Sequence, residues 1–164
     1  MGIIIIKVYK RVISFIKKII LKSLYVNHIK FGKKNILYPG CHLTIEKRGK
    51  VIIGNNCFFN HGCSINCLNE IMIGDDCIFG ENVKIYDHNH KFKENNELIK
   101  KQGYDIGKVI IGNNCWIGSD VIILSNVKIG NGVVIGAGTI VTKDIEDNAI
   151  VIDKTNIKKM ERII

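Results

Sequence analysis

The chain has 164 residues, of which 46% are hydrophobic and 24% charged, and this length and composition predict one domain with a sizeable core. The formal net charge of +9 comes from the N-terminal segment, because nine Lys and Arg residues and no acidic residue precede Glu46. Lysines interrupt the apolar runs of this segment, so we expect neither a secretory signal peptide nor a membrane-spanning helix of ~20 apolar residues.

The N-terminal segment, residues 1–30, is predicted to be a basic amphipathic helix. Its apolar residues recur near helical spacing with Lys and Arg between them: Ile5, Val8, Tyr9, Val12, Ile16, Ile19 and Ile20. Such a helix can lie on an anionic membrane through residues 1–26, or it can cover the open end of a repeat domain. Both roles stay open at this point.

Composition also bears on location and partners. Six cysteines without an obvious disulfide framework are compatible with the cytoplasm, and the basic helix could hold the protein at the inner face of the cell membrane. The basic residues are not interleaved with aromatic residues as in a nucleic-acid-binding module, so we expect no nucleic-acid partner.

A motif of six residues, aliphatic-Gly-x-x-small, repeats within residues 31–150. Its longest run has first positions six residues apart, at Ile111, Ile117, Ile123, Ile129, Ile135 and Val141. A period of six matches neither an amphipathic helix nor the plain alternation of a strand. It predicts short strands joined by tight corners, three to a coil, which climb as a triangular, all-β prism of parallel strands.

The first and fifth positions of each unit are predicted to point into the prism. Five of the six cysteines occupy the fifth position: Cys41, Cys57, Cys63, Cys77 and Cys115. Cysteine can act there as a small buried hydrophobic residue. The alternative is a metal site or disulfides, but the pair Cys63 and Cys67 lacks a second Cys or His pair.

The repeat stops after Ile85 and resumes at Val109, so residues 87–108 are predicted to form a protruding loop. His88 and His90 stand at the start of this loop, and long loops on rigid scaffolds commonly carry function. The tail, residues 151–164, is predicted to contain a short basic helix.

Two strings after the loop carry a resemblance to a known family. They are Ile111-Gly112-Asn113-Asn114-Cys115-Trp116-Ile117-Gly118-Ser119 and Ile135-Gly136-Ala137-Gly138-Thr139-Ile140-Val141-Thr142-Lys143-Asp144. In this order they resemble the hexapeptide-repeat acyltransferases of the maltose and galactoside O-acetyltransferase type. The string Tyr86-Asp87-His88-Asn89-His90 is similar to the branch that acetylates capsule and lipopolysaccharide sugars.

The resemblance covers about residues 50–145 and implies both an architecture and a reaction. The architecture is a left-handed parallel β-helix that forms a homotrimer, with active sites between neighbouring prisms. The reaction is direct transfer of an acetyl group from acetyl-CoA to the hydroxyl of a sugar or oligosaccharide acceptor, in the synthesis of a surface polysaccharide.

The resemblance also assigns roles to individual residues. His88 matches the general base, a role that neutral imidazole fills well near neutral pH. The backbone N–H of Ser119 matches the group that stabilises the oxyanion. Four residues match positions that contact CoA: Ser119, Ala137, Thr142 and Lys143.

Other residues near the histidine loop carry weaker expectations. Asn60 and His90 are candidates for contact with the acceptor. Asp87 is adjacent to His88 in the chain, is expected to point away from it, and is given no catalytic role.

Two alternative functions keep the same fold. One is acetyl transfer to the amine of an amino sugar or amino acid. The other is a γ-type carbonic anhydrase with zinc on His61, His88 and His90, although the two strings favour CoA and no metal is expected. Two departures from the family matter: residues 124–127 lack a Pro-Gly corner, and residues 150–154 replace a Gly-x-Pro-Ala stretch, so how the adenine end of CoA is held stays open.

Overall fold

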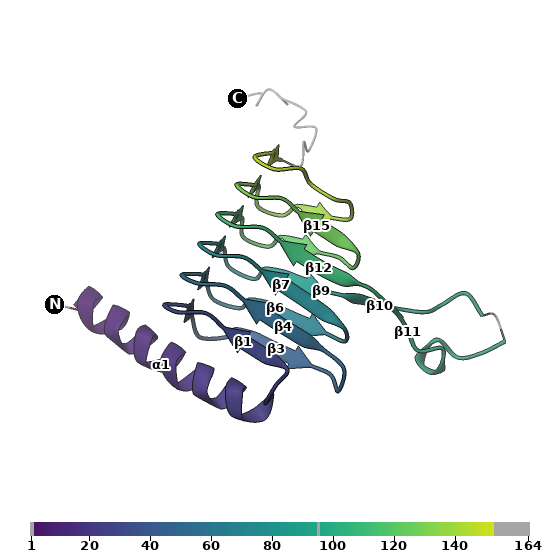
Figure 1. Ribbon diagram of the computed structural model, residues 1–164, viewed down its shortest axis with the longest axis horizontal. Coiled ribbons are helices and arrows are strands. Elements are labelled where there is room, and N and C mark those ends of the chain that lie inside the picture. The colour runs from purple at the N-terminus through teal and green to yellow at the C-terminus, as the bar shows by residue number, and fades with distance from the viewer. Residues whose placement is uncertain (1, 95, 153–164) are drawn as a thin grey trace, which may run out of the picture.

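The computed structural model describes residues 2–94 and 96–152, which form a parallel β-helix with a long helix at its N-terminal end (Figure 1). Helix α1 (Gly2–Leu24) precedes three parallel sheets, which are the three faces of the prism. The predicted all-β prism of hexapeptide repeats is therefore confirmed. The predicted helix in the tail lies outside the described residues.

Each coil contributes one short strand to each face. The first sheet holds β1 (Ile29–Phe31), β4 (Lys50–Ile53), β7 (Glu70–Ile73), β12 (Lys108–Ile111) and β15 (Val127–Ile129). The second holds β2 (Ile36–Leu37), β5 (Phe58–Phe59), β8 (Ile78–Phe79), β13 (Trp116–Ile117), β16 (Val134–Ile135) and β18 (Ile150–Val151). The third holds β3 (His42–Ile45), β6 (Ser64–Cys67), β9 (Lys84–Tyr86), β14 (Ile122–Ile123) and β17 (Ile140–Val141).

The core is a set of ladders in which like residues stack from coil to coil. Ile53 pairs with Ile73, and Ile73 with Ile111, so that one buried isoleucine lies on the next. In the second sheet Phe59 and Phe79 stack with ring centroids 4.4 Å apart. Burial of these first-position side chains removes a continuous apolar column from water, which is the main stabilising contribution in such a fold.

The corners need residues that tolerate a left-handed backbone. Asn56, Asp76 and Asn114 occupy the same corner of successive coils with φ of 56°, 59° and 54°. Asn and Asp adopt this conformation at lower cost than other side chains with a Cβ atom. These corners are therefore made by Asn and Asp, and the sequence contains a single proline, Pro39.

The six cysteines are buried and free, as predicted for core residues. In the ladder of Cys57, Cys77 and Cys115, each thiol donates a hydrogen bond to a glycine carbonyl of the next coil, at 3.1 Å in each case. The thiols thus fill the narrow corner and satisfy a carbonyl that would otherwise lack a partner there.

We expect Cys77→Val to fold and to keep its activity, because Val133 occupies the equivalent buried slot and the two volumes are close. The lost thiol hydrogen bond should cost about 1 kcal/mol in the free energy of unfolding. Thermal unfolding and an acetyl-transfer assay would measure the two effects. A folded but inactive variant would show instead that the thiol has a chemical role.

Helix α1 lies across the open end of the first coil (Figure 1). Ser14 Oγ accepts a hydrogen bond from the Leu37 amide at 2.8 Å, and Lys17 Nζ donates to the Cys41 carbonyl. Leu21 is buried against the core. Within the described part of the chain, no helix is both long enough and apolar enough to cross a membrane.

The repeat is interrupted where the predicted loop leaves the prism. Residues 88–106 contain an antiparallel pair, β10 (His88–His90) and β11 (Tyr104–Ile106), and a short 3-10 helix, η1 (Ile99–Lys101). The pair extends away from the coils, as Figure 1 shows. The two histidines are therefore at the base of the loop, where it joins the rigid prism.

Candidate active site

Asp87 and His88 form a hydrogen-bonded pair at the point where the chain leaves the prism. Asp87 Oδ1 lies 2.9 Å from His88 Nδ1, with the aspartate side chain fully buried and the histidine side chain 15% exposed. An ionised carboxylate can only accept a hydrogen bond, so it fixes the proton on Nδ1 and leaves Nε2 with a free lone pair. This is the tautomer that a general base requires.

The prediction that Asp87 points away from His88 is therefore wrong. Cys67 pairs with Ile45 in the third sheet, and Asp87 continues the same inward-facing position one coil further on. The chain turns outward at the next residue, so the imidazole of His88 folds back over the carboxylate. Neighbours in a regular strand would point to opposite faces, but the strand ends here.

Asp87 is held in place from several directions. Its carboxylate accepts hydrogen bonds from the amides of Leu68 and Asn69, at 2.9 and 2.7 Å, and from the Cys67 thiol at 3.2 Å. Its carbonyl accepts from Ser125 Oγ at 2.8 Å and from the Gly107 amide at 2.7 Å. The start and the end of the loop are thereby fastened to the same corner of the prism.

These contacts determine the charge of the pair. Burial alone would raise the pKa of the Asp87 carboxyl, but hydrogen bonds from the amides of Leu68 and Asn69, and from His88, outweigh it and hold the pKa below its usual range. Burial, together with the hydrogen bond to Asp87 and its charge, raises the pKa of the Cys67 thiol to about 12. At neutral pH the site therefore holds a carboxylate beside a protonated thiol.

Tyr104 joins the two histidines of β10. Its ring packs edge-on against His88, with centroids 5.2 Å apart, and lies 4.5 Å from the ring of His90. His90 is exposed and makes no contact with Asp87 among the hydrogen bonds of the described residues. Tyr104 also lines a pocket of about 400 Å³ with Lys47, Arg48 and Leu68.

The amide of Ser119 has no acceptor among the described residues, unlike the equivalent amide one coil below. At the preceding coil of this corner the Glu81 amide donates to Ser119 Oγ at 3.2 Å. The residue one coil above Ser119 is Ala137, whose methyl group cannot accept a hydrogen bond. Among the bonds formed within the described residues the Ser119 N–H has no acceptor, although the neighbouring Gly118 amide is bonded to Ile135.

At the corner between the first and second sheets, by contrast, the corresponding ladder is unbroken. There the amides of Asn55, Asp75, Asn113 and Asn131 all donate to an Asn or Asp side chain of the next coil, at 2.6–2.9 Å. At position 137 an alanine stands where that other corner has Asn or Asp, so within the described residues the next coil offers the Ser119 N–H no side-chain acceptor. The residue at position 137 therefore explains why the Ser119 N–H can bind a ligand.

The other predicted cofactor residues lie on the surface of the upper coils. Ala137, Thr142 and Lys143 are exposed. Gly138 has a φ of +76°, and open space surrounds the position where its Cβ would lie. A long ligand could therefore lie along this part of the prism without displacing a side chain.

The site residues are divided between two corners of the prism. Ser119 and Ala137 lie at the corner between the second and third sheets, whereas Asp87 and His88 lie between the third and first. Asn60 follows β5 and lies at the corner between the second and third sheets, as Ser119 does, and not at the corner of His88. Its side chain accepts a hydrogen bond from the His61 amide, and His61 Nδ1 lies 3.1 Å from the Pro39 carbonyl. No three His, Cys, Asp or Glu side chains of the described residues cluster in a way that could hold a metal ion.

Comparison with known proteins places this geometry in a family. The family described as bacterial transferase hexapeptide (six repeats) matches residues 108–143. The galactoside O-acetyltransferase of Lactococcus lactis is 31% identical over 143 residues, which cover 74% of this chain and 68% of the relative. The putative lipopolysaccharide biosynthesis O-acetyl transferase WbbJ of Escherichia coli is 30% identical over 130 residues, covering 75% and 66%.

Solved structures agree. A galactoside acetyltransferase in complex with coenzyme A superimposes with a TM-score of 0.71 at 30% identity, covering 82% of this chain and 64% of the other. The chain thus spans about two thirds of the length of these relatives. With its repeats, its left-handed β-helix fold and this similarity, the chain belongs to the hexapeptide-repeat acetyltransferases, the family that includes the galactoside O-acetyltransferases.

Proposed function

We propose that the protein transfers an acetyl group from acetyl-CoA directly to a sugar hydroxyl, with His88 as general base. The observation that carries this proposal is the buried Asp87 carboxylate on His88 Nδ1, which in a neutral imidazole holds the proton on Nδ1 and leaves the lone pair of Nε2 for the acceptor. A hydroxyl needs such a base because it is a weak nucleophile until its proton is removed. The coenzyme A complex of the related galactoside acetyltransferase supports acetyl-CoA as the donor.

The chain's groups would act in sequence. His88 Nε2 takes the proton of the acceptor hydroxyl while its oxygen bonds to the thioester carbon. The Ser119 amide, whose N–H has no acceptor among the described residues, stabilises the negative charge on the carbonyl oxygen. When the carbon–sulfur bond breaks, His88 returns the proton to the sulfur, and the products are an acetyl ester and CoA.

Four positions are proposed to hold the donor. Ser119 and Ala137 would contact the pantetheine arm, and Thr142 and Lys143 the part of CoA that carries phosphate, since an exposed ammonium suits an anion. Asn60 and His90 are proposed to contact the acceptor. The similarity to the lipopolysaccharide O-acetyl transferase supports a sugar of a surface polysaccharide as that acceptor.

Paired acceptors test the proposal. Purified protein is incubated with acetyl-CoA and one of three acceptors. The first is galactose, the second is N-formylgalactosamine, whose amine is blocked, and the third is free galactosamine. We expect an acetyl ester that hydroxylamine cleaves, with the first two acceptors. An amide formed only with the free amine would show an N-acetyltransferase and refute the hydroxyl acceptor.

We infer that the active enzyme is a trimer, because the two halves of the site lie at different corners of one prism. A neighbouring prism could bring its Ser119 corner against the His88 corner of the first. The second sheet also has an outward-facing apolar ladder, in which every paired residue is hydrophobic: Ile36, Phe58, Ile78, Trp116, Val134 and Ile150. Ile78 is 51% and Trp116 57% exposed, so this ladder suits contact with another chain.

Sedimentation equilibrium at micromolar concentration is expected to give the mass of three chains. Ile78→Glu should shift the protein toward monomer and abolish activity while the coil stays folded, because its side chain points outward. A wild-type protein that is monomeric and fully active would contradict the shared site.

We also propose a location at the inner face of the membrane, with residues 1–26 as the contact. The basic charge of this segment and the exposed position of α1 support this location. The surface that would make the contact is considered next.

A further inference from the structure

Helix α1 faces the prism with a mostly polar side, on which Leu21 is the buried apolar exception. The residues that approach the first coil include Ser14, Lys17 and Lys18, which bond to backbone groups of the coil. Lys10 lies over the ring of Tyr38 at 4.4 Å from its centroid. An amphipathic helix that serves only as a cap would be expected to turn its apolar side to the core.

The apolar side of α1 therefore faces away from the protein. Its large side chains are roughly half exposed or more: Ile4, Ile5, Ile6, Val8, Tyr9, Val12, Phe15, Ile16, Ile19, Ile20 and Leu24. They follow the helix for its whole length, so the exposed surface is continuous rather than scattered. A contiguous apolar surface of this kind marks an interaction site.

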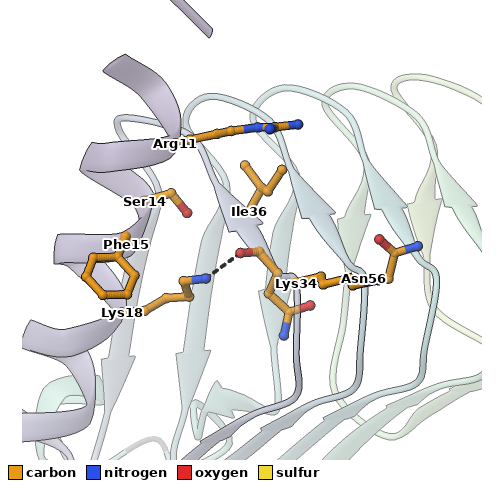
Figure 2. A pocket seen from close by; sticks show the side chains of 8 residues that line it. Arg11, Ser14, Phe15, Lys18, Lys34, Ile36 and Asn56 are labelled. Carbon is orange, nitrogen blue, oxygen red and sulfur yellow. Dashed lines mark hydrogen bonds between the residues drawn. The ribbon is translucent and has the colours of Figure 1, made fainter. Parts of the chain in front are cut away.

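A cationic pocket lies beside this apolar side, between α1 and the first coil (Figure 2). It has a volume of about 450 Å³, and its charged lining residues are Arg11, Lys18 and Lys34, with no acidic residue among those that line it. Phe15 belongs both to the pocket lining and to the exposed apolar side. The pocket and the apolar surface are thus adjacent.

The charges of the pocket lack an anionic partner of this chain within the described residues. Lys18 Nζ donates to the Asn35 carbonyl at 2.6 Å; this bond is the dashed line from Lys18 in Figure 2. Neither Arg11 nor Lys34 takes part in the ion pairs of the described chain. Burial, and then repulsion from Lys22, lowers the pKa of the Lys18 ammonium. The attraction of a bound anion would favour the charged ammonium and so offset both effects.

We propose that α1 docks the enzyme on a bilayer of anionic phospholipid, with one headgroup phosphate in the pocket of Arg11, Lys18 and Lys34. This site deepens the membrane location proposed above and does not depend on the chemistry at His88. The apolar side chains would enter the acyl region while the flanking Lys and Arg residues remain among the headgroups. The pocket would hold one phosphate in a defined place.

Charge favours a lipid surface over a second copy of the chain. Helix α1 carries six basic and no acidic residues: Lys7, Lys10, Arg11, Lys17, Lys18 and Lys22. Two such helices packed face to face would bring like charges together, which destabilises the pair. An anionic membrane neutralises the same charges, and each basic residue near the surface strengthens binding about fivefold.

The test is co-sedimentation of the full chain with vesicles of phosphatidylcholine alone or with phosphatidylglycerol. We expect binding only to the anionic vesicles. The double variant Ile16→Gln and Ile19→Gln should remove binding, because it makes the apolar side polar without touching the coil. The double variant Arg11→Gln and Lys34→Asn should weaken binding about 25-fold, because each of the two lost charges contributes about fivefold. Asn is chosen at position 34 because it tolerates the φ of 59° found there.

Matched controls separate the pocket from general charge and from catalysis. Lys30→Gln removes a charge from β1, in the same coil and outside the pocket, and should weaken binding less than Arg11→Gln alone. Acetyl transfer to a soluble sugar should be unchanged in the helix and pocket variants, so a failure at the membrane is distinct from a failure of the catalytic proposal. The proposal is overturned if Lys30→Gln matches Arg11→Gln, if inorganic phosphate binds and vesicles do not, or if Ile16→Gln and Ile19→Gln change the mass of the assembly instead of vesicle binding.

Discussion

Replacing His88 by alanine is expected to lower kcat by ~10²–10⁴, the usual effect of removing a general base. The imidazole acts on the proton of the acceptor, so acetyl-CoA should bind the variant with the affinity of the wild type. Steady-state kinetics and calorimetric titration with acetyl-CoA measure the two quantities. The fold should persist, because His88 belongs to the base of the loop and not to the buried ladders.

His90→Ala is the matched control. His90 belongs to the same strand and packs on the same ring of Tyr104, yet it lacks the contact with Asp87. We expect a small effect, mainly on the KM of the acceptor. If the His90 variant is inactive and the His88 variant nearly normal, the general base is His90. If both variants are active, neither histidine is the base.

Asp87→Asn is expected to lower kcat by up to about 10⁴-fold, comparable with the loss of the imidazole, because the ring remains but holds its proton on the wrong nitrogen. The amides of Leu68 and Asn69 require an acceptor from residue 87, so the new side chain should keep its oxygen toward them. Its NH₂ group would then face His88 Nδ1 and donate to it. The proton moves to Nε2, which can no longer act as a base.

The tautomer gives a readout that a purely structural role would not change. Nitrogen NMR of the His88 ring should show a proton on Nδ1 in the wild type and on Nε2 in Asp87→Asn. Asp105→Asn makes the same chemical change in the neighbouring strand β11 and should alter neither the tautomer nor kcat. An Asp87→Asn enzyme with unchanged kcat would show that the carboxylate only fastens the loop.

The same substitution should change the response to acid. Because the pKa of Asp87 is lowered in the folded protein, its stabilising effect is complete above about pH 4 and is lost as the pH falls through the folded value. Asn cannot titrate, so the variant should be less stable than the wild type at neutral pH, and the difference should shrink toward pH 2. Thermal unfolding across this range measures it.

The period-six pattern predicted the prism because every coil repeats the same physical requirement. The first positions, such as Ile53, Ile73 and Ile111, must stack, and the fifth positions must be small. These constraints are local and repeated, so a single sequence displays them many times. The same regularity predicted that the cysteines are buried core residues and that the interruption at residues 87–108 is a loop.

The pair of Asp87 and His88 was missed because it belongs to the end of a repeat. Alternation along a strand puts adjacent side chains on opposite faces, and this holds only while the strand continues. The signal that could have revealed it was the position of Asp87, which continues the buried ladder of Ile45 and Cys67. A carboxylate in a buried position needs partners, and the histidine beside it is one of them.

The free amide of Ser119 and the orientation of α1 depend on contacts between distant segments. The first requires knowledge of which residue lies one coil above Ser119, which follows from the register of the strands. The second could not come from helical periodicity, since an amphipathic pattern shows that a helix has two sides but not which one meets the protein. Ser14 and Lys18, polar residues that bond to the first coil, decide that orientation.

The pH dependence of kcat/KM in the wild type and in His88→Ala tests the central claim most directly. With a saturating acetyl-CoA concentration and a sugar acceptor, wild-type activity should rise through one ionisation in the range where imidazoles titrate. The residual activity of His88→Ala should lack that rise, while His90→Ala should retain it. If the same rise persists in His88→Ala, another group removes the proton and the proposed mechanism is wrong.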